Sequence, residues 1–189
     1  MVNTNKYENN SKLSDEEDIK YIKSFLSGDD KAFSFMYTKY VDELLAYGIS
    51  LGFDRETLKD IIQDVFYKLY FDKKILKNVI RLKFYLFKIF KNKLFDLHRS
   101  SVKTTAISYF EMSFSIKSTI LDFLIGEEER KDIENHIDRL LNKITDRQRD
   151  AIYLRFIQEM EYEEIGELLD MTAPAVRKLV SRAIKRMRE

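Results

Sequence analysis

The chain has 189 residues, of which 44% are hydrophobic and 34% charged, and its formal net charge is +1. That apolar fraction can fill the core of one domain or of two small ones, which argues against wholesale disorder. Five Gly and one Pro argue against a β-sandwich or barrel, and the absence of Cys excludes a disulfide scaffold, a zinc finger and a thiol nucleophile.

Residues 1–14 are rich in Asn, Ser and Lys, and we expect them to form a flexible tail. This N-terminus is polar and no run of about 18 apolar residues occurs anywhere, which predicts no membrane insertion, no signal peptide and a cytoplasmic protein. The two His residues stand in unrelated contexts, so we expect no metal site and no cofactor.

Two helices are predicted between Asp15 and Gly52. The first carries its apolar residues at helical spacing and ends near Gly28, and either Asp29 or Asp30 can cap the second. The inward face of the second helix is strongly aromatic, with Phe33, Met36, Tyr37, Tyr40, Leu44, Leu45 and Tyr47.

The next helix shows the clearest periodicity in the chain, with an unbroken apolar stripe that runs from Leu58 to Tyr70. Behind this stripe lies a polar one formed by Asp60, Gln63, Asp64 and Tyr67. Such a polar stripe is usually just solvated, and it can instead be a surface on which a basic partner docks.

A short basic and irregular stretch, 72–80, precedes a long helix expected over 81–99. If Leu82, Leu86, Ile89 and Leu97 point inward, another stripe interleaves aromatic and basic residues, namely Phe84, Phe87, Lys88, Lys91, Phe95 and Arg99. Such a surface suits single-stranded DNA, because bases stack on rings while cations follow the backbone. For each Phe taken alone, completing a hydrophobic core is the simpler interpretation.

Ser and Thr then cluster over 100–119, where the periodicity is poor. We expect a linker over 101–126 that docks or becomes ordered on binding, because its rings are too apolar for a freely solvated segment. Helical pattern resumes and runs to the end. With no convincing period-two segment, the fold class is all-α, with helical domains over 15–100 and 127–189.

The C-terminal segment predicts a helix-turn-helix. Thr145 and Gln148 can form a capping box, a short helix follows from Tyr162, and Thr172 and Pro174 fit the start of a last helix. The outer faces of that helix carry Arg177, Lys178, Ser181, Arg182, Lys185 and Arg186. The bidentate fork of an Arg side chain fits the edge of a guanine, whereas the cations further along the helix are better placed to contact phosphates. The simpler alternative is an amphipathic hairpin with a basic face.

Acidic and basic residues are segregated into separate blocks along the chain, which the net charge of +1 does not show. Residues 73–103 contain ten basic residues and one acidic, and 177–189 contain six basic and one acidic. Acidic segments, 42–72 and 127–170, precede each of these blocks. One basic block alone is best explained as a solvated helix surface, but the alternation favours two contacts with a polyanion.

These segments together resemble a known family. The sequence of 60–70, DIIQDVFYKLY, is similar to the DLVQDVFLKLW-type segment of bacterial sigma-70 family factors, and 82–96 resembles the KAYLFKIARNLALD-type segment that follows it. Residues 140–188 resemble region 4 of that family. A small chain with regions 2 and 4 only is similar to the extracytoplasmic-function (ECF) group.

The resemblance implies binding to core RNA polymerase and to promoter DNA, with an anti-sigma factor able to hold the two domains together and mask the DNA surfaces. It assigns polymerase docking to Asp60, Gln63 and Asp64. It assigns the −10 element to Lys77, Asn78, Phe84, Phe87, Lys88, Lys91 and Asn92. It assigns the −35 element to Thr172, Arg177, Lys178, Ser181, Arg182, Lys185 and Arg186.

Three other functions fit parts of the sequence. A stand-alone helix-turn-helix regulator should dimerise through an apolar face and would not need the acidic stripe. A helical enzyme would need paired carboxylates that converge, whereas the Glu residues over 127–129 and 163–164 are adjacent. A sigma-like interaction protein without DNA binding would not need both basic blocks. We therefore expect a specificity subunit that is not an enzyme and is monomeric when free.

Overall fold

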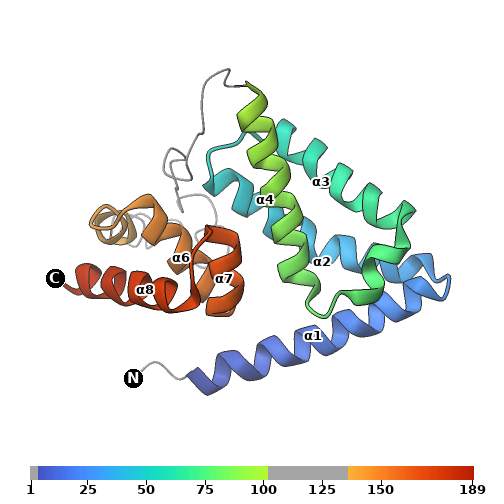
Figure 1. The fold of residues 1–189 in the computed structure, drawn as a ribbon, viewed down its shortest axis with the longest axis horizontal. Coiled ribbons are helices and arrows are strands. Elements are labelled where there is room, and N and C mark those ends of the chain that lie inside the picture. Colours follow the sequence, from blue (N-terminus) through green and yellow to red (C-terminus); the bar gives the residue numbers. More distant parts are fainter. Residues whose placement is uncertain (1–3, 102–135) are drawn as a thin grey trace, which may run out of the picture.

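The computed structural model describes residues 4–101 and 136–189, and every regular element in these two ranges is a helix (Figure 1). This confirms the all-α prediction. The predicted linker, 101–126, and the predicted start of the second domain at 127 lie outside the described residues, apart from Ser101. The helices are α1 Thr4–Leu26, α2 Asp30–Ser50, α3 Arg55–Phe71, the 3₁₀ helix η1 Lys73–Asn78, α4 Leu82–Ser101, α6 Asp146–Phe156, α7 Tyr162–Leu169 and α8 Ala173–Arg188.

The N-terminal unit consists of α1, α2, α3, η1 and α4. Asp29 caps α2 by accepting a hydrogen bond from the Lys31 amide, and Asp54 caps α3 in the same way. The prediction that the first helix begins at Asp15 is wrong, because α1 begins at Thr4. Residues 4–14 contain neither Gly nor Pro, so nothing in them interrupts a helix that extends from the core.

Two helices supply most of this core. The predicted apolar stripe of α3 is buried, from Leu58 to Leu69. On α4, however, the residues that point inward are Leu82, Leu86, Phe90 and Leu94, spaced four apart. The prediction that Leu97 belongs to the inward stripe is wrong, since its side chain is 41% exposed.

The C-terminal unit contains α6, α7 and α8, preceded by a further helical segment over residues 136–141 (orange to red in Figure 1). The capping box of Thr145 and Gln148 is present, and Pro174 lies in the first turn of α8 as predicted. Thr172 occupies the N-cap position but its side chain makes no capping hydrogen bond. At Gly166 a Cβ atom would lie 2.6 Å from the carbonyl oxygen of Met171, so the close neighbour is the turn rather than another helix.

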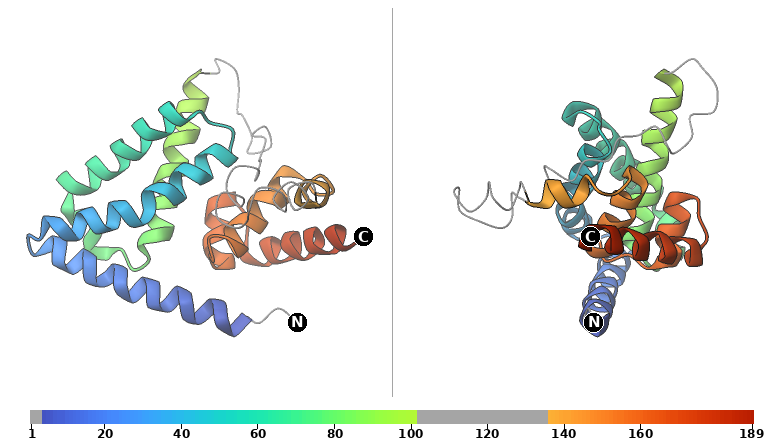
Figure 2. Two further views of the ribbon diagram at one scale, coloured as in Figure 1. Left: turned by 180° about the vertical axis from the view of Figure 1, so that it is seen from behind. Right: turned by 90° about the vertical axis from the view of Figure 1, so that its left-hand side faces the viewer.

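The two units pack against each other, with α4 against α7, as the three views in Figures 1 and 2 show. Deeper in the contact, the ring of Tyr47 on α2 stacks on the ring of Tyr153 on α6, with centroids 5.8 Å apart. We call this contact, formed by α2 and α4 on one side and α6 and α7 on the other, the junction. The junction determines which of the predicted functional residues are accessible.

Candidate nucleic-acid interface

The outer face of α8 carries all the residues predicted for the −35 element. Val176, Val180 and Ala183 are buried against the rest of the C-terminal unit and orient the helix. The opposite face is exposed and holds Thr172, Arg177, Lys178, Ser181, Arg182, Lys185 and Arg186. The structure therefore brings these residues together on one accessible, strongly basic surface, which is the arrangement that a major-groove helix requires.

Two hollows flank this face of α8. One, of about 450 Å³, is lined by residues that include Thr145, Leu179 and Arg182. The other, of about 330 Å³, includes Arg177 and Ser181 in its lining.

On α3, the predicted docking residues Asp60, Gln63 and Asp64 are all exposed. The carboxylate of Asp64 accepts a hydrogen bond from Lys93 Nζ at 2.9 Å; the Asp64 side chain is exposed and that of Lys93 is half-buried. The stripe continues into two exposed rings, Tyr67 and Phe71, whose centroids are 4.3 Å apart. The predicted polar stripe includes Tyr67 but not Phe71. The residue before Phe71, Tyr70, belongs to the predicted apolar stripe, so Phe71 marks the end of the predicted helix.

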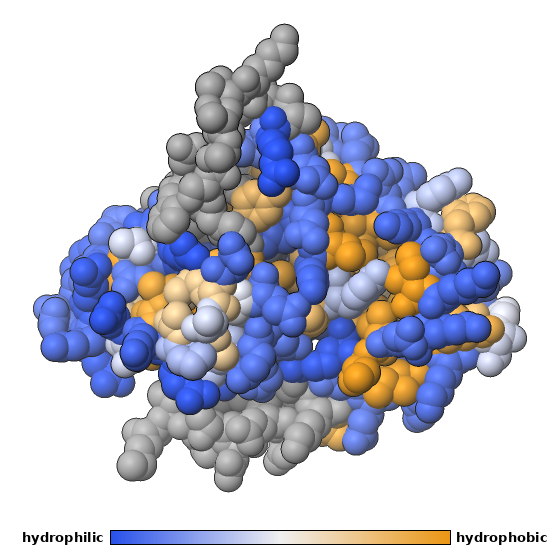
Figure 3. All heavy atoms as spheres, viewed as in Figure 1, coloured by the Kyte–Doolittle hydropathy of each residue, from blue (hydrophilic) through white to orange (hydrophobic). Residues whose placement is uncertain are grey.

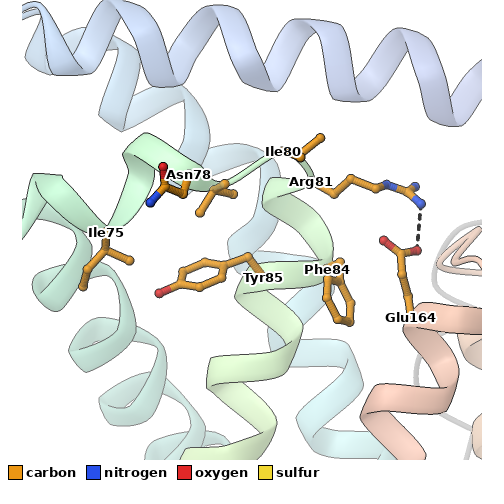
Figure 4. Close-up of a pocket in the computed structure, with 8 residues that line it drawn as sticks. Ile75, Asn78, Ile80, Arg81, Phe84, Tyr85 and Glu164 are labelled. Atoms are coloured by element: carbon orange, nitrogen blue, oxygen red, sulfur yellow. Dashed lines mark hydrogen bonds and ion pairs between the residues drawn. The ribbon is translucent and has the colours of Figure 1, made fainter.

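The residues predicted for the −10 element begin at η1, where Lys77 and Asn78 are exposed. Asn78 also lines a pocket of about 470 Å³ between η1 and the start of α4 (Figure 4). The walls of this pocket are mainly apolar, and include the rings of Phe84 and Tyr85. Apolar side chains also gather on the surface of the N-terminal unit in Figure 3.

One wall of the pocket comes from the other unit. Glu164 of α7 accepts a hydrogen bond from Arg81 Nη1 at 2.8 Å, the dashed line in Figure 4. Burial raises the pKa of the Glu164 carboxyl even though Arg81 and the Glu161 amide favour its charged form. Its Oε1 atom is buried and accepts no hydrogen bond. The C-terminal unit therefore supplies one wall of this pocket, through a carboxylate that is costly to bury.

The prediction that Phe87 and Lys91 lie on the outer face of α4 is wrong. Phe87 is fully buried, with its ring 5.2 Å from that of Tyr47. Lys91 is 1% exposed, and its Nζ atom is 3.0 Å from Oδ2 of Asp150 on α6. The Tyr47 hydroxyl donates to the other oxygen of Asp150 at 3.2 Å. Because desolvation outweighs the nearby carboxylate, the pKa of Lys91 is lowered.

The remaining residues predicted for the −10 element differ in exposure and in their contacts. Asn92 is exposed, and Phe84 is half-buried at the pocket. Lys88 is held by Glu167 of α7 at 2.6 Å. Contact of this surface with DNA stays a prediction, and it requires the C-terminal unit to move away. The partners Asp150 and Glu167 lie far away in the sequence, so no local pattern could have revealed them.

Two further features of the described residues bear on whether the chain holds a membrane-spanning segment or a metal site. Within 4–101 and 136–189, none of the helices combines the length and the apolar character that crossing a bilayer requires. Over the same residues, His, Asp and Glu side chains form no cluster of three or more that could hold a metal ion.

The chain is similar in sequence to bacterial RNA polymerase sigma factors. Residues 135–187 match the family model described as Sigma-70, region 4. The RNA polymerase sigma-H factor of Pseudomonas aeruginosa is 24% identical over 181 residues, covering 90% of this chain and 92% of that protein. The ECF RNA polymerase sigma factor SigW of Bacillus subtilis is 23% identical over 176 residues, with 90% and 94% covered.

Two solved structures share the fold. CnrH in complex with the cytosolic domain of CnrY aligns with a TM-score of 0.53 and 19% identity, over 90% of this chain and 94% of that one. The sigma factor RpoE of Bartonella quintana, in complex with the anti-sigma factor NepR, aligns with a TM-score of 0.54 and 21% identity, over 83% and 94%.

Proposed function

We propose that this chain, an RNA polymerase sigma factor of the sigma-70 family and its ECF group, selects promoters by joining core polymerase to the −10 and −35 elements. The observation that carries the assignment of surfaces is the face of α8, where seven predicted DNA-binding residues lie together and exposed. In this role the chain binds and positions DNA in the cytoplasm, and the chemistry of RNA synthesis belongs to the polymerase. Residues 15–100 and 127–189 would be its two binding domains.

The exposed face of α3 would dock on core polymerase. Asp60 and Asp64 supply negative charge for a basic partner surface, and Tyr67 and Phe71 extend the same stripe with apolar area. Exposed rings in contact with each other are typical of an interaction site rather than of a solvated surface. The acidic half and the aromatic half of this face of α3 would together bind a partner helix that carries both basic and apolar residues.

The −10 element would be read by η1 and α4. The pocket beside Asn78 and Phe84 is large enough for an unstacked base, and its aromatic walls allow stacking. In the arrangement described here, Glu164 forms one wall of the pocket and is bound to Arg81, and Lys91 is buried in the junction. We therefore infer that this state is inactive toward the −10 element, and that the two units separate when the chain joins polymerase.

An anti-sigma factor would act on the equilibrium between the packed and the separated arrangement of the two units. RpoE of Bartonella quintana was crystallised with an anti-sigma factor, and its chain shares this fold. For the present chain we propose a partner that binds the packed arrangement in preference to the separated one. Such a partner would inhibit the chain to the extent that it binds the packed arrangement more tightly than the separated one, because a ligand shifts an equilibrium only by its differential affinity.

Co-elution of the purified chain with core RNA polymerase tests this proposal. We expect a stable complex at moderate salt, with the free chain running as a monomer. Binding to duplex DNA without binding to polymerase would instead identify a stand-alone regulator. A chain that binds neither would contradict both assignments.

A further inference from the structure

The ring of Tyr162 lies against two guanidinium groups at the start of α7. The Cζ atom of Arg155 is 4.8 Å from the centre of the ring, and the Cζ atom of Arg177 is 4.9 Å from it. At these distances a guanidinium is attracted by the electron-rich face of an aromatic ring. Tyr162 therefore links Arg155, on α6, to Arg177, on α8.

Arg155 and Tyr162 form the fixed part of this arrangement. The Nη1 atom of Arg155 donates a hydrogen bond to the carbonyl oxygen of Met160 at 2.7 Å and lies 3.4 Å from the Glu161 carboxylate. Its side chain is only 12% exposed. Tyr162 is the first residue of α7 and lies within the capping box formed by Glu161 and Glu164. The ring is thus held in place before any ligand binds.

Arg177 is the exposed partner, near the start of α8, where the side chains of such a helix reach base edges. An unsupported Arg side chain samples many rotamers and loses that freedom on binding. Stacking on Tyr162 limits the orientations of the guanidinium beforehand, which reduces this cost. Orientation matters because the planar fork must present two N–H groups together to O6 and N7 of one guanine.

We propose that Tyr162 is a positioning residue, which holds the guanidinium of Arg177 in the orientation that reads a single guanine. The inference rests on the proposed function of α8 and deepens it. The 330 Å³ hollow beside the pair also includes Ser181 and Ile184 in its lining. A hydroxyl and an apolar side chain there suit the base next to that guanine, such as a thymine with its methyl group.

Selection from a pool of duplex DNA with a randomised segment tests this role. The full-length wild type is compared with Tyr162→Leu, Tyr162→Phe and Arg177→Ala, and the bound sequences give the base preference at each position. Tyr37→Leu is the matched control, because Tyr37 is an exposed tyrosine on α2, in the other unit. Thermal unfolding of every variant shows whether the fold is kept.

We expect the wild type, Tyr162→Phe and Tyr37→Leu to share a guanine preference at one position. Tyr162→Leu should lose that preference at the same position as Arg177→Ala, with affinity lowered about two- to fivefold, the size of an exposed cation–π contact. Adding Tyr162→Leu to Arg177→Ala should cost no further selectivity. If Tyr162→Leu unfolds more readily, Tyr162→Met, which keeps apolar volume without a ring, must lose the same preference.

Three results would overturn the inference. Unchanged base preferences in folded Tyr162→Leu would refute the role of Tyr162 while leaving the reading by α8 intact. An equal loss of binding at all positions would show that the ring acts on the fold or on phosphate contacts. A wild type that enriches no sequence would remove the DNA-binding assignment of α8, and this inference with it.

Discussion

Lys91 and Asp150 form a buried ion pair between the two helical units, with Nζ and Oδ2 3.0 Å apart and side chains 2% and 7% exposed. The pair joins α4 to α6 at the centre of the junction. Lys91 is also one of the residues predicted to contact the −10 element. The same ammonium group cannot contact DNA while it neutralises Asp150, so under the proposed function the packing of the units would be coupled to binding of the −10 element.

Replacing Asp150 by Ala should open the junction. The change leaves the Lys91 ammonium without its carboxylate in a buried site, and removing one partner of a buried pair costs about 3–5 kcal/mol. Separation of the units would relieve this cost by hydrating Lys91. We expect a larger radius of gyration in small-angle X-ray scattering, without loss of helix content.

The matched control is the double variant Lys91→Met/Asp150→Leu, which replaces the ion pair with apolar side chains of similar size. Such replacements are often neutral or stabilising, so this variant should stay as compact as the wild type. An Asp150→Ala protein with unchanged dimensions and thermal stability would show that the ion pair does not hold the junction.

The packing of the units should tighten as the pH falls from neutral toward 5. Burial raises the pKa of Glu164 above its ordinary value of 4.5 and the pKa of Asp15 above 3.8, although Arg81 opposes both shifts. For Glu164, which lies at the contact between the units, the packed state therefore binds a proton more readily than the separated state just above the ordinary value, and protonation favours the packed state. The carboxyl of Asp15 has its neighbours Arg81, Asp18 and Lys39 within the N-terminal unit and does not report on the packing.

Scattering measured across this pH range would show the effect as a decreasing radius of gyration. Glu164→Gln removes one titrating group while keeping its shape, so the variant should respond less to pH and remain packed at neutral pH. An expansion of the wild type on mild acidification would contradict the assigned direction of the pKa shifts.

Reversing the charges of Asp60 and Asp64 to Lys should abolish binding to core polymerase. Both side chains are exposed, and the pair between Asp64 and Lys93 is a surface contact worth about 0–1 kcal/mol, so the fold should persist. The comparison uses Asp42→Lys, a charge reversal at an exposed position on α2. Equal binding by the α3 double variant and the α2 variant would remove α3 as the docking surface.

Gly166→Ala should destabilise the helix-turn-helix. The added Cβ atom would lie 2.6 Å from the Met171 carbonyl oxygen, and a backbone atom in a tight turn cannot easily move aside. Forcing extra volume into a packed site costs about 1–3 kcal/mol. Thermal unfolding checks this, with Glu163→Ala as the neighbouring exposed control. A melting temperature equal to that of the wild type would mean that the turn relaxes freely.

Local patterns were sufficient to predict most of the helices. The buried stripe of α3 and the capping box at Thr145 both depend on residues within four positions of each other, where periodicity and capping chemistry act. The exposed face of α8 followed from the same reasoning, because the C-terminal unit buries only one side of that helix.

The junction could not be predicted from such patterns. Lys91 faces inward because of Asp150, which is 59 residues away, and a lysine in an amphipathic helix ordinarily indicates the solvent side. The stack of Arg155, Tyr162 and Arg177 was missed for a similar reason, since three successive helices must fold before these groups meet.

Transcription by core polymerase from a pool of promoter fragments is the most direct test of the sigma-factor assignment. With the wild-type chain added, we predict transcripts that begin at defined positions on fragments sharing two sequence elements. With the Asp60→Lys/Asp64→Lys chain, we predict no such transcripts. If the wild-type chain binds the fragments but initiates no transcription above core polymerase alone, the assignment is contradicted.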